Sequence, residues 1–267
     1  MYNAVSHVAM EHITNFKRIL KLGYAHSKKE TLGSTYGMGW TIFKDIIYFG
    51  VFILFRYLMS GSKEIDGMNF ILYLITGLIP WFHMNNVINS GTHAIKKNAA
   101  IIKSINFPIT TLPTIEVISI FINRSFSIII GLIVLAIFGD IASFNLIKFL
   151  YFHFSMMIFM VGFNLVFSAF IAISVDFQHL YSAFTRVVFY SLPILWSFNQ
   201  VASNTIIIRI LKLNPMVYIV EGYRQAYVTN IPINIKYTTY FWMVTIVLLT
   251  LGGFIQYKLR KYYSDFI

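Results

Sequence analysis

The sequence predicts an all-α polytopic membrane protein with six transmembrane helices, in a single transmembrane domain that covers residues 1–267. Hydrophobic residues make up 57% of the chain and charged residues only 12%, whereas soluble domains carry about 25% charged residues. Apolar stretches near the roughly 20 residues that a bilayer requires recur along the chain. Basic residues gather at the edges of these stretches rather than along one soluble face, as they do in membrane proteins.

The composition also excludes several classes of site. The formal net charge of +11 could indicate nucleic-acid binding, but the placement of the basic residues between apolar stretches argues against it. The chain has no cysteine, so it can form neither a disulfide nor a thiolate zinc site nor an iron–sulfur cluster. Residues 1–38 lack the apolar core of about 7 to 15 residues that a cleavable signal peptide has. We therefore expect the first transmembrane span to insert uncleaved.

Residues 1–38 contain the pattern of an amphipathic helix. Apolar residues recur at helical spacing between residues 5 and 24, which predicts a helix that lies in the cytoplasmic membrane interface. The basic residues on and after this helix are Lys17, Arg18, Lys21, Lys28 and Lys29. From the pattern alone, a simple membrane anchor remains an alternative to any more specific role.

The first two predicted spans cover residues 40–58 and 70–90. Lys44 and Asp45 lie one turn inside the first span, and Arg56 lies near its far end. We expect Lys44 and Arg56 to extend toward the membrane surfaces, because long basic side chains can bury their stems and keep their charge in water. Contact with a partner subunit is the alternative.

A short amphipathic helix is predicted over residues 94–104, between the second and third spans. One side carries Ala94, Ile95, Asn98, Ile101 and Ile102, and the other side carries Lys96, Lys97 and Lys103. Pro108 prevents this helix from continuing. A charged helix held between two spans can transmit a push, whereas a loop anchored in the lipid interface would give the same periodicity.

The third predicted span covers residues 113–138 and carries Arg124 near its middle. An arginine at this depth is costly in lipid, so we expect it to face the bundle interior and to pair there with Glu116, Asn123 or another span. Such a pair would be either structural or part of a transport pathway.

The remaining predicted spans cover residues 146–174, 180–198 and 240–257. Residues 175–178 form a predicted cytoplasmic turn between the fourth and fifth spans. Residues 199–236 are too long for a plain turn and too apolar for an exposed loop, which indicates additional structure on the outer side.

Two short helices are predicted in this outer segment, at residues 206–213 and 217–227, with a break at Asn214-Pro215. Glu221 and Arg224 are three residues apart and therefore neighbours on one helix face. They form either a local ion pair or part of the outer exit of a pathway.

The distribution of basic residues predicts that both termini lie in the cytoplasm. In that orientation residues 17–29, 96–103 and 258–261 lie inside, and they carry a higher density of lysine and arginine than the longer outer segments. We find no internal repeat in the sequence, which argues against the duplicated halves of many secondary transporters.

Several sequence pieces, taken in order, resemble one family of membrane proteins. These pieces are G-L-I-P-W-F at 77–82, N-x-x-x-S-x-T-x-A-I at 86–95, N-F-P at 106–108, Y-S-L-P-I-L-W at 190–196, Asn214-Pro215, E-G-Y-R at 221–224 and S-D-F-I at 264–267. Their order and spacing resemble the permease subunits of ABC exporters that move lipid-linked polysaccharides and teichoic acids. The resemblance runs nearly end to end and is closest to the wall teichoic acid export permeases of Gram-positive bacteria. Val175 is a departure, because relatives commonly have arginine there.

The resemblance implies the permease half of an ATP-driven exporter that moves an undecaprenyl-linked cell-surface polymer outward across the bacterial cytoplasmic membrane. It implies a homodimer of this chain with two copies of an ATPase subunit. The chain has no G-x-x-x-x-G-K-[ST] loop and no Ser/His/Asp or paired-carboxylate arrangement, so we do not expect it to be an enzyme by itself. ATP and Mg²⁺ are expected on the ATPase subunit. The chain itself is expected to bind no cofactor, metal or nucleic acid.

The resemblance also implies roles for particular residues. The helix at 94–104 would dock into the ATPase through Ile95, Lys96, Lys97, Asn98, Ile101, Ile102 and Lys103. The basic residues of the N-terminal helix would flank the entrance for the lipid-pyrophosphate head of the substrate. The translocation pathway would be lined by Tyr48, Phe52, Phe55, Trp81, Phe82 and Arg124, although ordinary packing is the alternative for the aromatic residues. The outer segment would re-enter the membrane, with Asn214, Pro215, Glu221, Tyr223 and Arg224 as its candidate functional residues.

Two other transporter classes remain open. An ABC permease for a small lipid or drug would share the fold but would have a narrower cavity. A stand-alone ion-coupled transporter or lipid scramblase would need carboxylates inside the membrane, and only Asp45 and Glu116, near the ends of spans, come close to this requirement.

Overall fold

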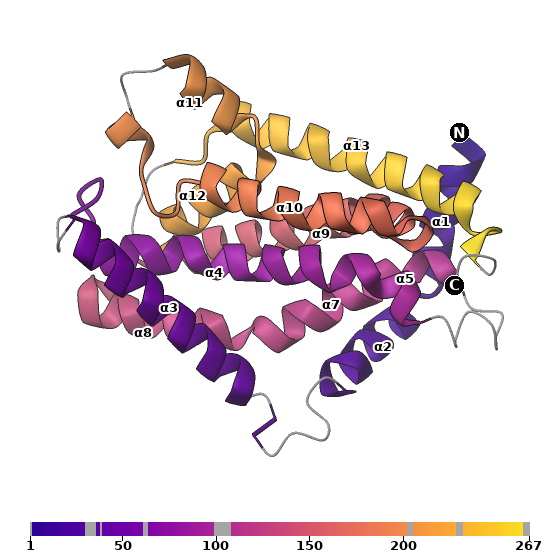
Figure 1. The fold of residues 1–267 in the computed structure, drawn as a ribbon, viewed down its shortest axis with the longest axis horizontal. Coiled ribbons are helices and arrows are strands. Elements are labelled where there is room, and N and C mark those ends of the chain that lie inside the picture. The colour runs from indigo at the N-terminus through magenta and orange to yellow at the C-terminus, as the bar shows by residue number, and fades with distance from the viewer. Residues whose placement is uncertain are drawn as a thin grey trace.

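The computed structural model describes residues 2–29, 36–37, 39–60, 64–98, 108–201, 205–227 and 232–263. In these residues the regular structure is helical, as the sequence predicts, apart from one isolated β-bridge between Ile65 and Met68. The long helices run along a common axis, and both chain termini lie at one end of the molecule (Figure 1). We call this end the terminal end. The opposite end is marked by α11 (Thr205–Lys212).

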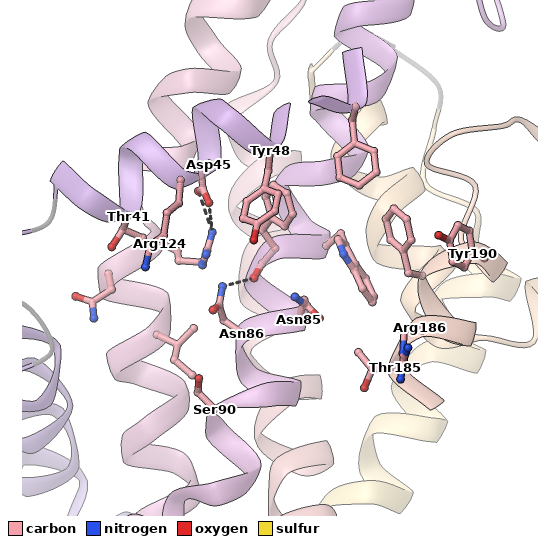
Figure 2. Close-up of a pocket in the computed structure, with 17 residues that line it drawn as sticks. Thr41, Asp45, Tyr48, Asn85, Asn86, Ser90, Arg124, Thr185, Arg186 and Tyr190 are labelled. Carbon is pink, nitrogen blue, oxygen red and sulfur yellow. Dashed lines mark hydrogen bonds and ion pairs between the residues drawn. The ribbon is translucent and has the colours of Figure 1, made fainter. Parts of the chain in front are cut away.

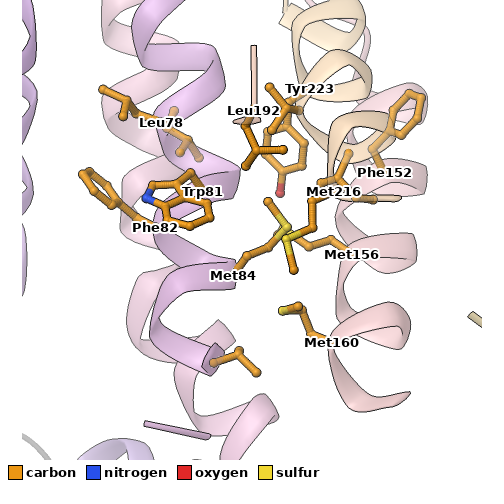
Figure 3. Close-up of a cluster of buried hydrophobic side chains, with 14 of the residues drawn as sticks. Leu78, Trp81, Phe82, Met84, Phe152, Met156, Met160, Leu192, Met216 and Tyr223 are labelled. Carbon is orange, nitrogen blue, oxygen red and sulfur yellow. The ribbon is translucent and has the colours of Figure 1, made fainter. Parts of the chain in front are cut away.

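The central helix of the bundle is α4 (Phe70–Asn89), and nearly all of its residues are buried. A helix that is apolar all round is expected to lie inside a bundle. It packs against α9 (Leu146–Ile173) and α12 (Pro215–Tyr227). Figure 3 shows part of the core that these helices form, which includes Trp81, Met84, Met156, Met160, Leu192, Met216 and Tyr223. The flexible methionine side chains suit the irregular space where three helices converge.

A close contact joins α13 (Ile235–Leu259) to α9, because glycines in both helices remove side-chain bulk. A Cβ atom on Gly252 would lie 2.6 Å from Cβ of Leu165, and one on Gly162 would lie 3.1 Å from the backbone nitrogen of Leu249. Both distances are shorter than ordinary van der Waals contact. At these glycines the backbones of the two helices therefore pack directly against each other.

Four segments in the described part of the chain are long and apolar enough to cross a membrane: Phe70–Lys97, Ile109–Phe138, Leu146–Ile173 and Ile235–Leu259. The other two predicted spans correspond to α3 (Gly39–Ser60) and α10 (Val175–Ser191). These two helices are not among the four segments. Helix α3 contains the charged residues Lys44, Asp45 and Arg56, and α10 has only 17 residues, about 25 Å of helix. Arg56, expected to extend toward a membrane surface, is instead buried within the bundle. Length and composition therefore support four of the six predicted spans.

The structure also divides one predicted span and moves the boundaries of another. The third span consists of α7 (Leu112–Arg124) and α8 (Phe126–Phe138), which are interrupted at Ser125. The Ser125 hydroxyl donates a hydrogen bond to the carbonyl of Ile122 (2.8 Å), and such local bonds compete with regular helical bonding.

The predicted turn at residues 175–178 is wrong, because α10 already begins at Val175. The Ser174 side chain accepts a hydrogen bond from the backbone N–H of Phe177 and caps this helix. The helix ends at Ser191 rather than at residue 198, since Leu192 is extended in front of Pro193.

The N-terminal segment forms two helices, α1 (Tyr2–Thr14) and α2 (Phe16–Lys29), instead of one. In α2 the buried residues are Ile19, Gly23 and Ser27, which recur every four residues on one face. This face packs against α7, where a Cβ on Gly23 would lie 2.6 Å from the side chain of Ile118. The amphipathic pattern of α2 therefore reflects burial against the bundle.

The helix predicted over residues 94–104 is described only up to Asn98, and in that part it ends at Lys97. Helix α5 covers Ala94–Lys97, and Asn98 adopts non-helical backbone angles (φ −105°, ψ 22°). The backbone N–H of Asn98 donates to the carbonyl of Ile95 (3.2 Å), three residues back, and its side chain donates to the carbonyl of Ala94 (2.8 Å). Three residues of the predicted coupling set lie outside the described residues: Ile101, Ile102 and Lys103.

Candidate functional site

A cavity of about 630 Å³ lies among α3, α4, α7 and α10 (Figure 2), and we call it the central cavity. Its aromatic lining residues are Tyr48, Phe52, Trp81, Phe82, Phe189 and Tyr190. Its polar lining residues include three basic residues and three amides: Lys44, Arg124, Arg186, Asn85, Asn86 and Asn123. The cavity thus combines flat apolar surfaces with groups that donate and accept hydrogen bonds.

Most of the residues predicted to line a pathway meet in the central cavity. Tyr48, Phe52, Trp81, Phe82 and Arg124 all belong to its lining. Phe55 does not, because its side chain lies on the outer surface of α3 and is 54% exposed. Asn85, Asn86 and Arg186 line the same space but were not predicted as lining residues, because no periodicity reveals which faces of separate spans converge.

The aromatic side chains of the central cavity form two packed groups, which together draw on three helices. Tyr48 of α3 lies 5.8 Å from Phe82 of α4, measured between ring centroids, and Trp81 of α4 lies 5.2 Å from Phe189 of α10. Phe52 of α3 belongs to the second group, with its ring 5.5 Å from that of Phe189. These separations are typical of favourable aromatic pairs, so each ring is held by its neighbour.

An ion pair between Arg124 and Asp45 joins α7 to α3. Nη1 of Arg124 lies 2.8 Å from both carboxylate oxygens of Asp45, and Asp45 is 1% exposed. The guanidinium also lies 5.7 Å from the ring centroid of Phe82. The predicted partner on another span is therefore Asp45. Pairing two opposite charges lowers the cost of placing either of them inside an apolar bundle.

The other two basic residues of the central cavity differ from Arg124. Lys44 and Arg186 are exposed, and neither forms an ion pair with a carboxylate of the described residues. Both therefore present positive charge to the space of the cavity. Such groups can bind phosphate oxygens through charge-assisted hydrogen bonds.

A single buried carboxylate connects three elements at the terminal end. Oε1 of Glu116 on α7 accepts a hydrogen bond from Nζ of Lys97 in α5 (2.8 Å). Oε2 of the same residue lies 3.5 Å from Nδ1 of His26 in α2. The side chain of Glu116 is only 5% exposed. This contact joins the segment after α4 to the N-terminal helices.

The rest of the predicted coupling set divides between buried and accessible positions. Ile95 is completely buried against Ala169, Ala172 and Tyr263, so its side chain packs inside this chain. Lys96 is partly exposed. The apolar side of α5 thus anchors the segment to the bundle.

A second group of contacts fixes α1 at the same end. Glu11 accepts a hydrogen bond from the Thr110 hydroxyl and lies 3.6 Å from Nη1 of Arg260, which follows α13. Nε2 of His12 lies 2.9 Å from the hydroxyl oxygen of Thr114 on α7. The N-terminal helix is therefore tied to both α7 and the end of α13.

Because His12 is partly buried, we expect acid to weaken the attachment of α1. Burial lowers the pKa of the His12 imidazole below its usual value of 6.5, so the unfolded chain binds a proton more readily. This contribution to stability is complete above about pH 6.5 and is lost as the pH falls through the lowered pKa. The thermal unfolding midpoint of the purified protein in detergent should decrease from about pH 7 to pH 5, and less so for His12→Gln. An equal decrease in both proteins would contradict this assignment.

The predicted basic entrance residues all lie on the exposed side of α2. They are Lys17, Arg18, Lys21, Lys28 and Lys29. Their face is opposite to the face that contacts α7, so their charge is directed away from the bundle. This placement is compatible with contact to anionic headgroups and also with a simple membrane anchor.

The predicted outer residues are mainly packing residues. Nη1 of Arg224 lies 2.7 Å from Oε1 of Glu221, and its guanidinium lies 3.6 Å from the ring centroid of Tyr73 on α4. A Cβ on Gly77 would lie 2.9 Å from Nη2 of Arg224, so glycine leaves room for this contact. Arg224 is 2% exposed. These contacts attach α12 to α4 and place Arg224 outside the lining of the central cavity.

Three further residues of the outer set have defined structural roles. Asn214 and Pro215 stand at the start of α12, where Oδ1 of Asn214 accepts a hydrogen bond from the backbone N–H of Met216 (3.0 Å). Tyr223 is buried, and its hydroxyl lies 2.6 Å from Nδ1 of His153 on α9. The break between α11 and α12 lies where the sequence predicts it.

Comparison with known proteins gives a consistent result. The sequence profile of the family described as ABC-2 type transporter matches residues 27–228. The O-antigen export system permease protein RfbA of Myxococcus xanthus is 22% identical over 209 residues, 78% of this chain and 79% of the relative. Two proteins of the same description from Klebsiella pneumoniae are 22% identical over 235 residues (88% of each chain) and 23% identical over 256 residues (96% and 93%).

Proposed function

The chain belongs to the ABC-2 type transporter family as a non-catalytic, multi-pass membrane permease, and we propose that it exports an undecaprenyl-linked cell-surface polymer, a teichoic acid or polysaccharide. In this proposal ATP is hydrolysed by a separate ATPase subunit, and both termini of the permease lie in the cytoplasm. The terminal end then faces the cytoplasm, and α11 and α12 lie in the outer half of the membrane. The relatives named as O-antigen export permeases support a lipid-linked saccharide as the substrate.

The composition of the central cavity is the observation that carries this proposal. Sugar rings have apolar C–H faces that can pack on aromatic side chains, and the two aromatic groups that contain Tyr48 and Phe189 offer such surfaces. Their hydroxyl groups can pair with the amides of Asn85 and Asn86. Lys44 and Arg186 supply positive charge for a pyrophosphate. A polymer that slides through this space needs contacts of this repeated and tolerant kind.

A second copy of the chain would complete the pathway. The central cavity is lined by α3 and α10, and both helices expose large apolar side chains away from the bundle. On α3 these include Ile47, Val51, Leu54 and Leu58. Figure 1 shows α3 diverging from the other helices toward its N-terminal end. We infer that two copies meet along these helices and enclose the polymer, with one ATPase subunit for each permease.

The segment that follows α4 is the proposed contact with the ATPase. Lys96 and Lys97 lie at the terminal end, directly before residues 99–107. Because Lys97 is bonded to Glu116, a movement of this segment would reach both α7 and α2. We infer that ATP-driven motion is transmitted to the helices near the substrate entrance by this contact.

The double substitution Lys44→Gln and Arg186→Gln tests the proposed substrate site. With the ATPase bound, basal ATP hydrolysis should persist, whereas stimulation by a lipid-pyrophosphate saccharide should fall on the order of tenfold for the loss of about 1.4 kcal/mol of binding. The matched control is the double substitution Arg209→Gln and Lys236→Gln, which removes two exposed basic residues near the opposite end. Normal stimulation in the first variant would refute the site. If the Lys44→Gln and Arg186→Gln variant exported polymer normally but no longer exported a drug, the result would favour an ABC permease for small molecules.

A further inference from the structure

A second cavity of about 460 Å³ lies among α9, α11, α12 and α13, near the end opposite the termini. We call it the outer cavity. It shares no lining residue with the central cavity, and α12 separates it from α4. Its volume falls within the range of about 300 to 1,000 Å³ typical of small-molecule sites.

Fixed aromatic rings make up much of the outer cavity. They belong to Phe152, Phe198, Tyr218, Tyr237 and Tyr240. The hydroxyl of Tyr218 lies 3.0 Å from the hydroxyls of both Tyr151 and Thr238, and the hydroxyl of Tyr240 donates to the carbonyl of Leu213 (2.5 Å). These bonds hold the rings of Tyr218 and Tyr240 in place before any ligand arrives, which lowers the entropy cost of binding.

The shape of the cavity depends on a glycine. A Cβ at position 222 would lie 2.2 Å from the ring of Phe152. Gly222 therefore allows this ring to stand against α12 and to form one wall. The wall is part of the folded bundle, because Phe152 belongs to the main core.

The polar lining is balanced in charge and suits hydroxyl groups. Its ionisable groups with opposite charge are Lys212 and Glu221, so the cavity does not favour a strongly anionic ligand. The ammonium of Lys212 lies 4.8 Å from the ring centroid of Phe198 and 5.8 Å from that of Tyr237. Oε1 of Gln225 is buried and accepts no hydrogen bond, which leaves an acceptor whose desolvation is not compensated.

We propose that the outer cavity binds uncharged sugar units of the exported saccharide on the outer side of the membrane. The aromatic rings contact the apolar faces of the sugar, and Lys212 and Glu221 pair with its hydroxyls. The cavity is coupled to the exit of the route, because Glu221 holds Arg224 against Tyr73 of α4. This inference rests on the proposed export function.

Photocrosslinking in the intact exporter tests the outer cavity. The photoreactive residue p-benzoyl-phenylalanine is placed at the position of Tyr237, and the full chain is expressed with its ATPase in its own host. After illumination, mass spectrometry of the modified peptide should show covalently attached sugar. The matched control position is Ile235, which lies on the same turn of α13, is 80% exposed and does not line the cavity. It should give no sugar adduct.

The same probe at Tyr48, in the central cavity, separates the two proposals. Sugar adducts at Tyr48 but not at Tyr237 would overturn the outer site and leave the export function intact. A phospholipid adduct at Tyr237 would overturn it too, by identifying a lipid pocket. Absence of sugar at both positions would overturn both proposals. In addition, Tyr237→Ala should reduce the amount of surface polymer several-fold, whereas Ile235→Ala should not.

Discussion

Replacing Asp45 with alanine should destabilise the folded permease and abolish export. The substitution leaves the guanidinium of Arg124 inside the bundle without its carboxylate, and the Arg124 side chain is only 13% exposed. Removing one partner of a buried ion pair costs about 3 to 5 kcal/mol. Since this pair is a main polar link between α3 and α7, α3 should separate from the bundle and open the central cavity. A lower unfolding temperature in detergent and loss of surface polymer measure the two effects.

The double substitution Asp45→Ala and Arg124→Ala distinguishes an ion pair from two independent contributions. If the pair explains the loss, the double variant should be more stable than the sum of the single effects predicts, because it leaves no isolated buried charge. Arg209→Ala, at an exposed position on α11, is the matched control and should change stability little. Strict additivity of the two single substitutions would contradict a coupled pair.

Lys97→Glu should uncouple ATP hydrolysis from transport. The new carboxylate would face Glu116, which is nearly fully buried and in the unmodified chain accepts a hydrogen bond from Lys97. Two carboxylates at this distance repel, so the segment after α4 should detach from α7. We expect the ATPase to hydrolyse ATP while substrate stimulation falls on the order of tenfold, within the usual range of coupling free energies. Parallel measurement of hydrolysis and surface polymer tests this.

Exchange of the two charges provides the control for this prediction. Adding Glu116→Lys to Lys97→Glu restores opposite charges at the same contact and should recover much of the stimulation. Lys261→Glu introduces the same charge change at an exposed position of the terminal end and should have a smaller effect. If the exchanged pair fails as completely as Lys97→Glu alone, the contact between these two side chains is not the link that transmits motion.

The sequence predicts those features that depend on local patterns. The all-helical fold, the two short helices around Asn214 and the aromatic character of the cavity follow from apolar runs, proline and asparagine positions, and composition. These signals lie within one or two helical turns.

Features that depend on how separate helices face one another could not be predicted. Asp45 and Arg124 are 79 residues apart, and helical periodicity gives no relative rotation for α3 and α7. For the same reason Glu116 could be named as a partner for Arg124, although it bonds to Lys97 and lies beside His26. Only the rule that charges in an apolar bundle must pair was available, and it does not identify the partner.

The end of α5 just before Asn98 has a different cause. The place of this asparagine in the apolar and basic pattern fits a continuous helix from 94 to 104, but its backbone angles are non-helical and its backbone N–H bonds to the carbonyl of Ile95, three residues back. Asparagine can occupy a helix or end it, and the choice depends on such local bonds. A pattern of hydrophobicity alone cannot distinguish the two.

The central claim is that this chain moves a lipid-linked saccharide outward when its ATPase subunit hydrolyses ATP. The most direct measurement uses proteoliposomes that contain the purified chain with its ATPase and an undecaprenyl-pyrophosphate oligosaccharide. The sugar that becomes accessible to periodate on the side facing α11 and α12 is then quantified over time. We predict that accessibility rises only with both ATP and the ATPase present and that Lys44→Gln with Arg186→Gln reduces this rise. An equal rise without ATP or without the ATPase would contradict the account.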